Sequence, residues 1–159
     1  MFREIRRKDR LVSAETGIEL LNKGICGVLS VIGDDDYPYG VPVNYLYRDN
    51  CIYIHCFMDG HKVDAVKKHP KVCFTVTADE EVMKDQISTN YTSVIAFGKA
   101  TLLPPPENDE RQSVFAAIMQ KYIPGETERT SDYTKNNQEK TNLIKISIEH
   151  MTCKKRNIR

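Results

Sequence analysis

Apolar residues, many of them β-branched, gather in six short runs along the chain. Runs of this kind, bounded by Gly, Pro, Asp and Asn, are typical of β-strands. They predict strands over residues 25–32, 39–47, 51–57, 72–76, 91–103 and 143–151. Turn residues at 33–36 and 48–50 join the first three strands as hairpins, so the sheet is expected to be antiparallel.

Two segments instead show the apolar spacing of a helix packed on one face. The first covers residues 14–23, where Ser13 is the expected N-cap and Gly24 is expected to end the helix in a left-handed turn. The second covers residues 107–122. Its packing stripe is Val114, Phe115, Ile118 and Met119.

The remaining polar segments are expected to connect these elements. Residues 79–90 are predicted to be irregular, and residues 124–140 to form a loop with at most a short helix near its end. Gly98 is a candidate bulge in the fifth strand. Six strands linked mostly by hairpins, with helices only as connections, predict a mainly β fold with peripheral helices, an antiparallel barrel rather than a doubly wound sheet.

Length and charge limit the partners. A chain of 159 residues is most simply one domain, 1–159, and its 23 Lys and Arg nearly balance 22 Asp and Glu. No net field favours nucleic acid or an anionic membrane. The basic clusters at 3–10 and 154–159 are interpreted as solvated chain ends.

The chain is expected to be cytoplasmic. No apolar run approaches the roughly 20 residues of a membrane span, and the first residues have no apolar core for a signal peptide. The five cysteines are an odd number and lie mostly in apolar runs, so reduced, buried thiols are expected.

The most informative stretch is Gly60-His61-Lys62, which opens a short basic helix. The first amides of a helix lack backbone partners and lie at the positive end of its dipole, so a phosphate is stabilised there. Lys62 adds a full charge. The alternative from this segment alone is a surface helix with a solvated lysine run.

Other chemistry has weaker support. Pro42 has no amide to donate, so it belongs on an edge strand, open to a planar heterocycle, to solvent or to another subunit. His55 and Cys56 point to opposite faces of a strand and cannot share a zinc ion, so no metal is predicted. No nucleophile motif and no glycine-rich phosphate loop is present.

Several of these stretches together resemble the nitroimidazole-resistance (Nim) proteins, which belong to the pyridoxamine 5'-phosphate oxidase-like flavin-binding split barrels. The resemblance extends from Arg6 to Arg156. It is carried by Arg6-Arg7-Lys8-Asp9-Arg10, Gly40-Val41-Pro42-Val43-Asn44-Tyr45, Ile54-His55-Cys56, Gly60-His61-Lys62, Ser93-Val94-Ile95-Ala96-Phe97-Gly98 and Ile148-Glu149-His150-Met151-Thr152.

The resemblance implies a six-stranded antiparallel split β-barrel that forms a homodimer, with one flavin, FMN or else FAD, in each cleft between the subunits. His61 and Lys62 would contact the flavin phosphate, and His61 would also face the cleft as the catalytic candidate. The other implied cofactor-binding residues are Val41, Pro42, Val43, Asn44, Cys56, Ser93 and Val94.

The implied activity is a flavin-dependent oxidoreductase. Electrons from NADH or NADPH would pass to a small acceptor, for example a nitroaromatic such as a 5-nitroimidazole. One alternative is a non-catalytic flavin-binding or sensing module. Another is a haem or deazaflavin in the same fold, with His61 or His55 as the haem ligand.

Overall fold

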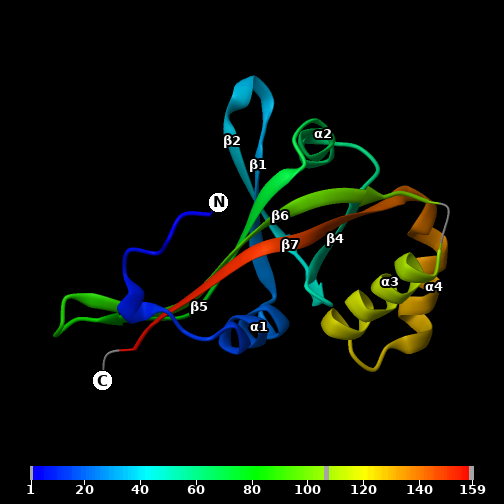
Figure 1. Ribbon diagram of the computed structural model, residues 1–159. Helices are drawn as coiled ribbons and strands as arrows, with labels where there is room; N and C mark the ends of the chain where they lie inside the picture. The colour runs from blue at the N-terminus through cyan, green and yellow to red at the C-terminus, as the bar shows by residue number, and fades with distance from the viewer. Residues whose placement is uncertain (1, 106–107, 158–159) are drawn as a thin grey trace.

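The computed structural model describes residues 2–105 and 108–157 and is built around one antiparallel β-sheet (Figure 1). Its seven strands lie in the order β2-β1-β5-β6-β7-β4-β3. They are β1 (Cys26–Ile32), β2 (Pro38–Asn44), β3 (Leu46–Arg48), β4 (Cys51–Phe57), β5 (Lys71–Met83), β6 (Ser88–Leu103) and β7 (Thr141–Arg156). The mainly β prediction is confirmed. The expected six-stranded barrel is corrected to a seven-stranded open sheet with β2 and β3 at its edges.

The seventh strand arises because the segment 39–47 breaks at Tyr45. The Tyr45 amide donates to the hydroxyl of Tyr122 at 2.8 Å instead of to a neighbouring strand. The same hydroxyl donates toward the carbonyl of Ile25 or Tyr45, at 2.8 and 2.7 Å. A side chain from a distant helix therefore ends β2 and lets β3 begin.

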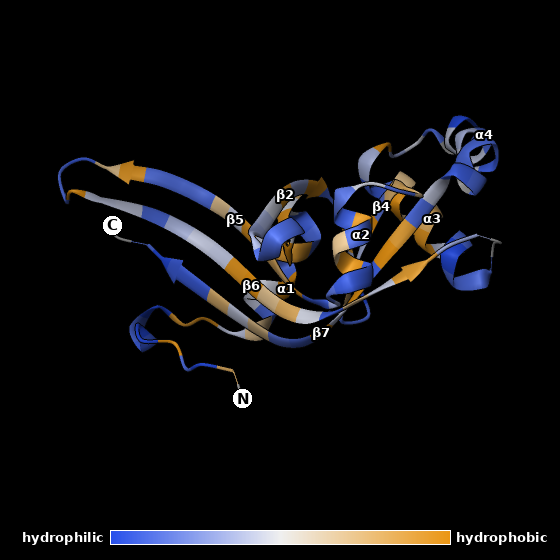
Figure 2. Cartoon of the chain, turned by 90° about the horizontal axis from the view of Figure 1, so that it is seen from above, coloured by the Kyte–Doolittle hydropathy of each residue, from blue (hydrophilic) through white to orange (hydrophobic). Residues whose placement is uncertain are grey.

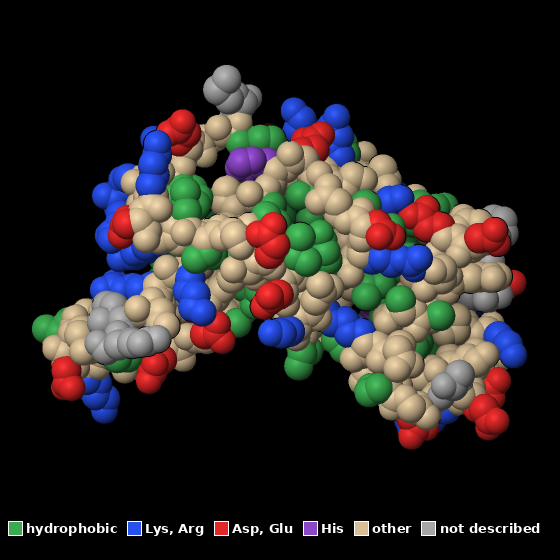
Figure 3. Space-filling model, turned by 60° about the horizontal axis from the view of Figure 1, so that its bottom comes forward, with side chains coloured by type: hydrophobic (Ala, Val, Ile, Leu, Met, Phe, Trp, Pro, Cys, Tyr) green, Lys and Arg blue, Asp and Glu red, His purple; other side chains and the backbone are tan. Residues whose placement is uncertain are grey.

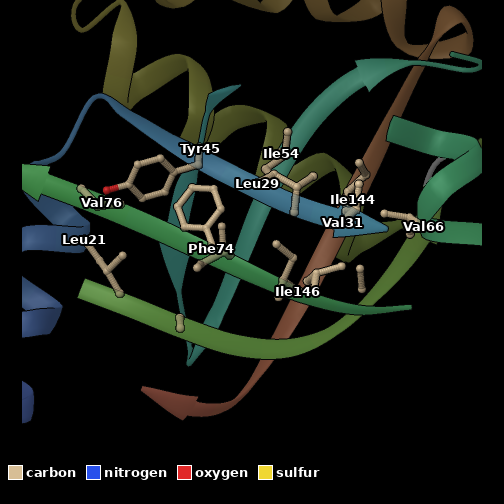
Figure 4. Close-up of a cluster of buried hydrophobic side chains, with 14 of the residues drawn as sticks. Leu21, Leu29, Val31, Tyr45, Ile54, Val66, Phe74, Val76, Ile144 and Ile146 are labelled. Carbon is tan, nitrogen blue, oxygen red and sulfur yellow. The ribbon is translucent and has the colours of Figure 1, made fainter. Parts of the chain in front are cut away.

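The main core lies on one side of the sheet, under α1 (Ala14–Lys23) and α2 (His61–Lys68). Buried side chains of β1, β4, β5 and β7 meet there, and Figure 4 shows Leu29, Ile54 and Ile146 converging on Phe74. Tyr45 packs edge-on against Phe74, with 4.9 Å between ring centroids. Burial of these apolar surfaces supplies the main favourable free energy of folding.

A second, smaller cluster lies against the other face of β4 and β7. Helix α3 (Asp109–Tyr122) buries Val114, Phe115 and Ile118 there, against Tyr53 and Leu143. The predicted stripe of this helix is thereby confirmed, although Pro106 and Glu107 lie outside the described residues. Strand β7 consequently serves both clusters, because Ile144 and Ile146 face the main core while Leu143 faces α3.

Helix α1 begins as predicted and ends differently. Ser13 accepts a hydrogen bond from the Thr16 amide at 3.4 Å and so caps the helix. Gly24 is extended, with φ −64° and ψ 136°, so the expected left-handed turn is wrong. Glycine is required here for space, because a β-carbon would collide with the Tyr45 hydroxyl.

Strands β5 and β6 extend as a long hairpin away from the body, and the hydropathy colouring shows that this arm is largely polar (Figure 2). The prediction of irregular structure over 79–90 is therefore wrong. Pairing resumes after a register shift between Ala78 and Glu81. Gly98 lies at a second register shift, against β7, which confirms the predicted bulge.

The segment after α3 also differs from expectation. Helix α4 (Thr127–Asn137) and a short 3-10 helix, Gln138–Lys140, occupy most of the predicted loop. Thr130 Oγ1 donates to the Glu126 carbonyl and Thr134 Oγ1 to the Thr130 carbonyl, both at 2.8 Å. Within the described residues, no helix is both long and apolar enough to cross a bilayer.

Candidate functional site

The start of α2 is an open helix N-terminus entered through glycine. Gly60 has a φ of +112°, a conformation that favours glycine, and its carbonyl accepts from the amides of Val63 and Asp64 at 2.8 and 3.1 Å. Among the described residues, no side chain caps this helix, and an added β-carbon at Gly60 would meet nothing within 4 Å. The helix start is therefore accessible to a ligand.

Val63 and Val66 hold this helix in place, because both are buried in the main core. Their i, i+3 spacing fixes the face of α2 that meets the sheet. His61 and Lys62 lie before this anchor, in the first turn. Their position depends on a short buried stripe rather than on a long helix.

His61 lies against the hairpin of β1 and β2. Its ring stacks on Tyr39 at 4.1 Å between centroids, with planes 12° apart, and its Nε2 lies 3.7 Å from Asp34 Oδ2. The side chain is still 42% exposed. Tyr39 and Asp34 are contacts that the sequence analysis missed, because only the folded hairpin brings them to α2.

Lys62 lies near the end of β4. Burial lowers the pKa of His55, and the positive charge of Lys62 lowers it further. Burial raises the pKa of Cys56, and Lys62 offsets this only in part, so the thiol stays protonated. Cys56 is 8% exposed and belongs to the main core, so only its backbone can face a ligand.

The predicted ring-lining strand is the edge strand β2, as Pro42 indicated. Val41 and Val43 turn toward the core, whereas Pro42 and Asn44 are exposed on the opposite face. The side-chain amide of Asn44 donates through Nδ2 to the Ile25 carbonyl at 3.0 Å. The exposed side of β2 therefore offers mainly backbone and proline surface to a planar group.

The structure does not bring Ser93 and Val94 to this place within one chain. Val94 is fully buried in the core, and Ser93 pairs with Thr77 and Lys154 on the outward face of the sheet. His61 lies beside Gly33, just past the Ile32 end of β1. Thr77, the partner of Ser93, is level with Cys26 at the opposite end of β1, because Thr75 pairs with Val28.

The outward face also carries an apolar cavity of about 590 Å³. Val28, Ile32 and Phe97 on this face are 36–37% exposed. Phe2 stacks on His150 at 4.5 Å and reaches Phe97 at 5.5 Å between centroids. Ser93 lies on the same face as Ile95 and Phe97, because every second residue of β6 points to the same side of the sheet.

Metal and thiol chemistry have little support at these positions. No three His, Cys, Asp or Glu side chains among the described residues lie together as metal ligands. All five cysteines are free; Cys56 and Cys153 are buried, as expected, but Cys26 is exposed. Burial raises the pKa of Cys153 as well, so neither buried cysteine is poised as a thiolate.

Several solved structures share this fold. A candidate 5-nitroimidazole antibiotic resistance protein from Bacteroides thetaiotaomicron is 16% identical over 91% of this chain and 85% of its own, with a TM-score of 0.74. The flavocytochrome Anf3 from Azotobacter vinelandii is 21% identical over 98% of this chain and 73% of its own, with a TM-score of 0.82.

A third similar structure is a FAD-binding protein from Mesorhizobium loti, which is 22% identical over 94% of this chain and 97% of its own, with a TM-score of 0.67. The sequence has no significant match among curated proteins. The family model for pyridoxamine 5'-phosphate oxidase matches residues 13–155. This match confirms the family resemblance drawn from the motifs: the chain belongs to the pyridoxamine 5'-phosphate oxidase family.

Proposed function

We propose that this protein binds a flavin, FMN or FAD, by its phosphate at the start of α2 and acts as a flavin-dependent oxidoreductase. One observation carries the proposal: a glycine-entered, uncapped helix start presents His61 and Lys62 beside the open edge strand β2. The site fits a phosphate, because unpartnered amides, a lysine and free space at Gly60 coincide. Similarity to a FAD-binding protein and to a flavocytochrome supports the same class of ligand.

The residues of this chain would act by binding and positioning. Lys62 and the first amides of α2 would hold the phosphate, and the exposed backbone of residues 41–44 would border the ring. His61, which stacks on Tyr39 and lies near Asp34, would present its ring at the mouth of the site. The bound flavin would supply the electron transfer itself, from NADH or NADPH to a small acceptor such as a nitroaromatic.

The proposal includes a homodimer. Ser93 is level with the opposite end of β1 from His61, so both can approach one flavin only if a second copy supplies Ser93. The half-exposed apolar side chains of the outward face suit such an interface. The expected mass in solution is therefore that of two chains.

An absorbance spectrum of the purified protein, with mass spectrometry of whatever acid releases, tests the ligand. Anaerobic mixing with NADH or NADPH then tests the activity. Bleaching of the flavin absorbance followed by reoxidation with a 5-nitroimidazole is expected. A bound flavin that neither nucleotide reduces would identify a binding or sensing module, and a Soret band without flavin absorbance would identify a haem protein.

Variants test the phosphate anchor. Combined His61→Ala and Lys62→Ala should weaken flavin retention far more than Lys67→Ala. Lys67 is the matched control, because it lies on the same helix and its Nζ is 3.7 Å from Asp64 Oδ1. Equal losses from both variants would indicate diffuse charge attraction and contradict a formed phosphate site.

A further inference from the structure

Residues 7–12 and 153–157 lie together at the far end of the sheet from α3. Leu11 forms an isolated β-bridge with Lys154 of β7, and the Val12 amide donates to the Cys153 carbonyl at 3.2 Å. Arg10 Nη1 donates to the hydroxyl of Tyr91, on β6, at 3.3 Å. Two basic segments that the sequence analysis interpreted as separate solvated ends therefore form one surface.

This surface encloses a cleft of about 480 Å³. Its charged lining consists of Arg7, Arg10, Lys155, Arg156 and Asp9. Figure 3 shows Lys and Arg side chains gathered on the side of the molecule that carries this part of the chain. The cleft is hollowed and strongly cationic, although the whole chain is nearly neutral.

The single carboxylate of the cleft is already engaged. Arg7 Nε and Nη2 donate to the two oxygens of Asp9 at 2.8 and 2.6 Å, and this pairing lowers the Asp9 pKa to about 2. Within the described residues, no carboxylate lies within 4 Å of Arg10, Lys155 or Arg156. The bridge between Leu11 and Lys154 brings Arg10 to the same cleft as Lys155 and Arg156, so a bound anion would meet cations from both segments.

We propose that this cleft is a second anion site, which binds the phosphoryl groups of a dinucleotide. Arginine donates paired, charge-assisted hydrogen bonds that match phosphate oxygens, and among the described residues neither Arg10 nor Arg156 forms an ion pair within 4 Å. The inference rests on the proposed function, which supplies two such ligands: the diphosphate of FAD and the 2'-phosphate of NADPH.

The location supports this assignment. Lys154 pairs across the strand with Ser93, and Arg156 with Tyr91, so the cleft borders the outward face that carries the predicted flavin contact Ser93. The start of α2 lies beyond the other end of β1. The cleft is thus a separate binding site within each chain, and it can extend a flavin or nicotinamide site that a dimer completes.

Calorimetric titration of the purified full chain with ADP and with 2',5'-ADP tests the proposal. These compounds reproduce the adenosine halves of FAD and of NADPH, so tighter binding of ADP identifies FAD and tighter binding of 2',5'-ADP identifies NADPH. Arg10→Ala and Arg156→Ala should each weaken binding by about tenfold, the effect of losing a hydrogen bond from a charged group. Arg10→Lys should restore part of the loss.

Lys23→Ala is the matched control, since Lys23 is an exposed cation on α1, with its Nζ 3.7 Å from Glu19 Oε2. Failure of both compounds to bind at millimolar concentration would overturn the proposal, as would equal weakening by Lys23→Ala. Tighter binding of a random single-stranded oligonucleotide than of either compound would overturn it in favour of a polyanion surface.

The outcome is separable from that of the proposed function. If the protein binds and reduces flavin but binds neither ADP nor 2',5'-ADP, the α2 site is supported and only the cleft proposal is overturned. If the protein binds one of these compounds through Arg10 but binds no flavin, the cleft proposal is supported and the proposed flavin site at α2 is contradicted.

Discussion

Helices α2 and α3 both pack on the sheet through a short apolar stripe, but their first turns are built in opposite ways. Helix α3 has Asn108 as N-cap, whose side chain accepts from the Arg111 amide at 2.9 Å, and it carries Asp109 and Glu110 next. Helix α2 begins at Gly60 with His61 and Lys62. The first arrangement satisfies the amides and the dipole, whereas the second leaves both available.

The difference separates a structural helix from a candidate binding helix. Glu110 of α3 accepts from the Tyr53 hydroxyl at 2.9 Å and from Lys145 at 2.6 Å, so its first turn is fastened to β4 and β7. Cations at the start of α2 oppose the dipole and reduce helix stability. Asp64 lies in the same turn, with its Oδ1 3.7 Å from Lys67 Nζ, and a bound anion at the helix start would interact favourably with His61, Lys62 and the dipole.

The largest expected effect is the loss of stability when the attachment of α3 to the sheet is broken. Arg111 is fully buried and donates to the carbonyls of Leu103 and Thr141, and its guanidinium lies 4.9 Å from the Phe115 ring centroid. Arg111→Ala should lower the free energy of unfolding by about 3 kcal/mol, because the carbonyls of two partly buried residues lose this charged, buried donor. Chemical denaturation measures this loss. A change below about 1 kcal/mol would contradict the role given to Arg111.

The cap of α3 should contribute less. Asn108→Ala removes the acceptor for the Arg111 amide and should cost about 1 kcal/mol in the free energy of unfolding. Asn108→Asp keeps an acceptor and is the matched control, expected to retain wild-type stability. Equal destabilisation by both variants would show that the cap is not the cause.

The last turn of α3 should make stability depend on pH. Burial lowers the pKa of Lys121 to about 8, while its Nζ donates to the Tyr45 carbonyl at 2.9 Å and lies 4.1 Å from the Tyr45 ring centroid. The folded chain releases this proton at lower pH than the unfolded chain, so this group's contribution to the free energy of unfolding rises between about pH 8 and 10.

Because this side chain is only partly buried, the expected rise is less than about 1 kcal/mol. Denaturation of wild type and Lys121→Met across this pH range measures it as a difference between the two proteins. A difference that falls as pH increases would have the wrong sign for a lysine buried in this way.

The smallest expected effect completes the comparison. Lys62→Gln removes a cation from the first turn of α2 and should raise the free energy of unfolding of the flavin-free protein by a few tenths of a kcal/mol. The same change should weaken flavin retention. Thermal denaturation with and without FMN measures both. Loss of stability in the flavin-free protein would show that Lys62 has a structural role instead.

Local patterns were sufficient to predict the elements that lie in the core. Strand β4, the hairpin of β1 and β2, and the packing stripe of α3 follow from the alternation or spacing of their own residues. The Gly60 helix start was also visible, because glycine and two basic residues adjoin in sequence. Each of these features is determined by residues that are close together in the sequence.

Features that depend on distant partners could not be predicted in this way. The polar arm over 79–90 forms strands because β5 and β6 satisfy each other's backbone groups, not because its side chains favour a core. The break at Tyr45 requires Tyr122, which comes from α3. The cationic cleft requires the bridge between Leu11 and Lys154, so neither terminal segment reveals it alone.

The position of β7 has a consequence for synthesis of the chain. This strand lies between β6 and β4 and contributes to both apolar clusters, yet it is encoded after every other element of the sheet. While a ribosome is still translating this region, β4 and β6 each lack a neighbour and present unpaired edges. The nascent polypeptide must therefore avoid aggregation until residues 141–156 leave the exit tunnel, and a chaperone that shields β edges would increase its yield.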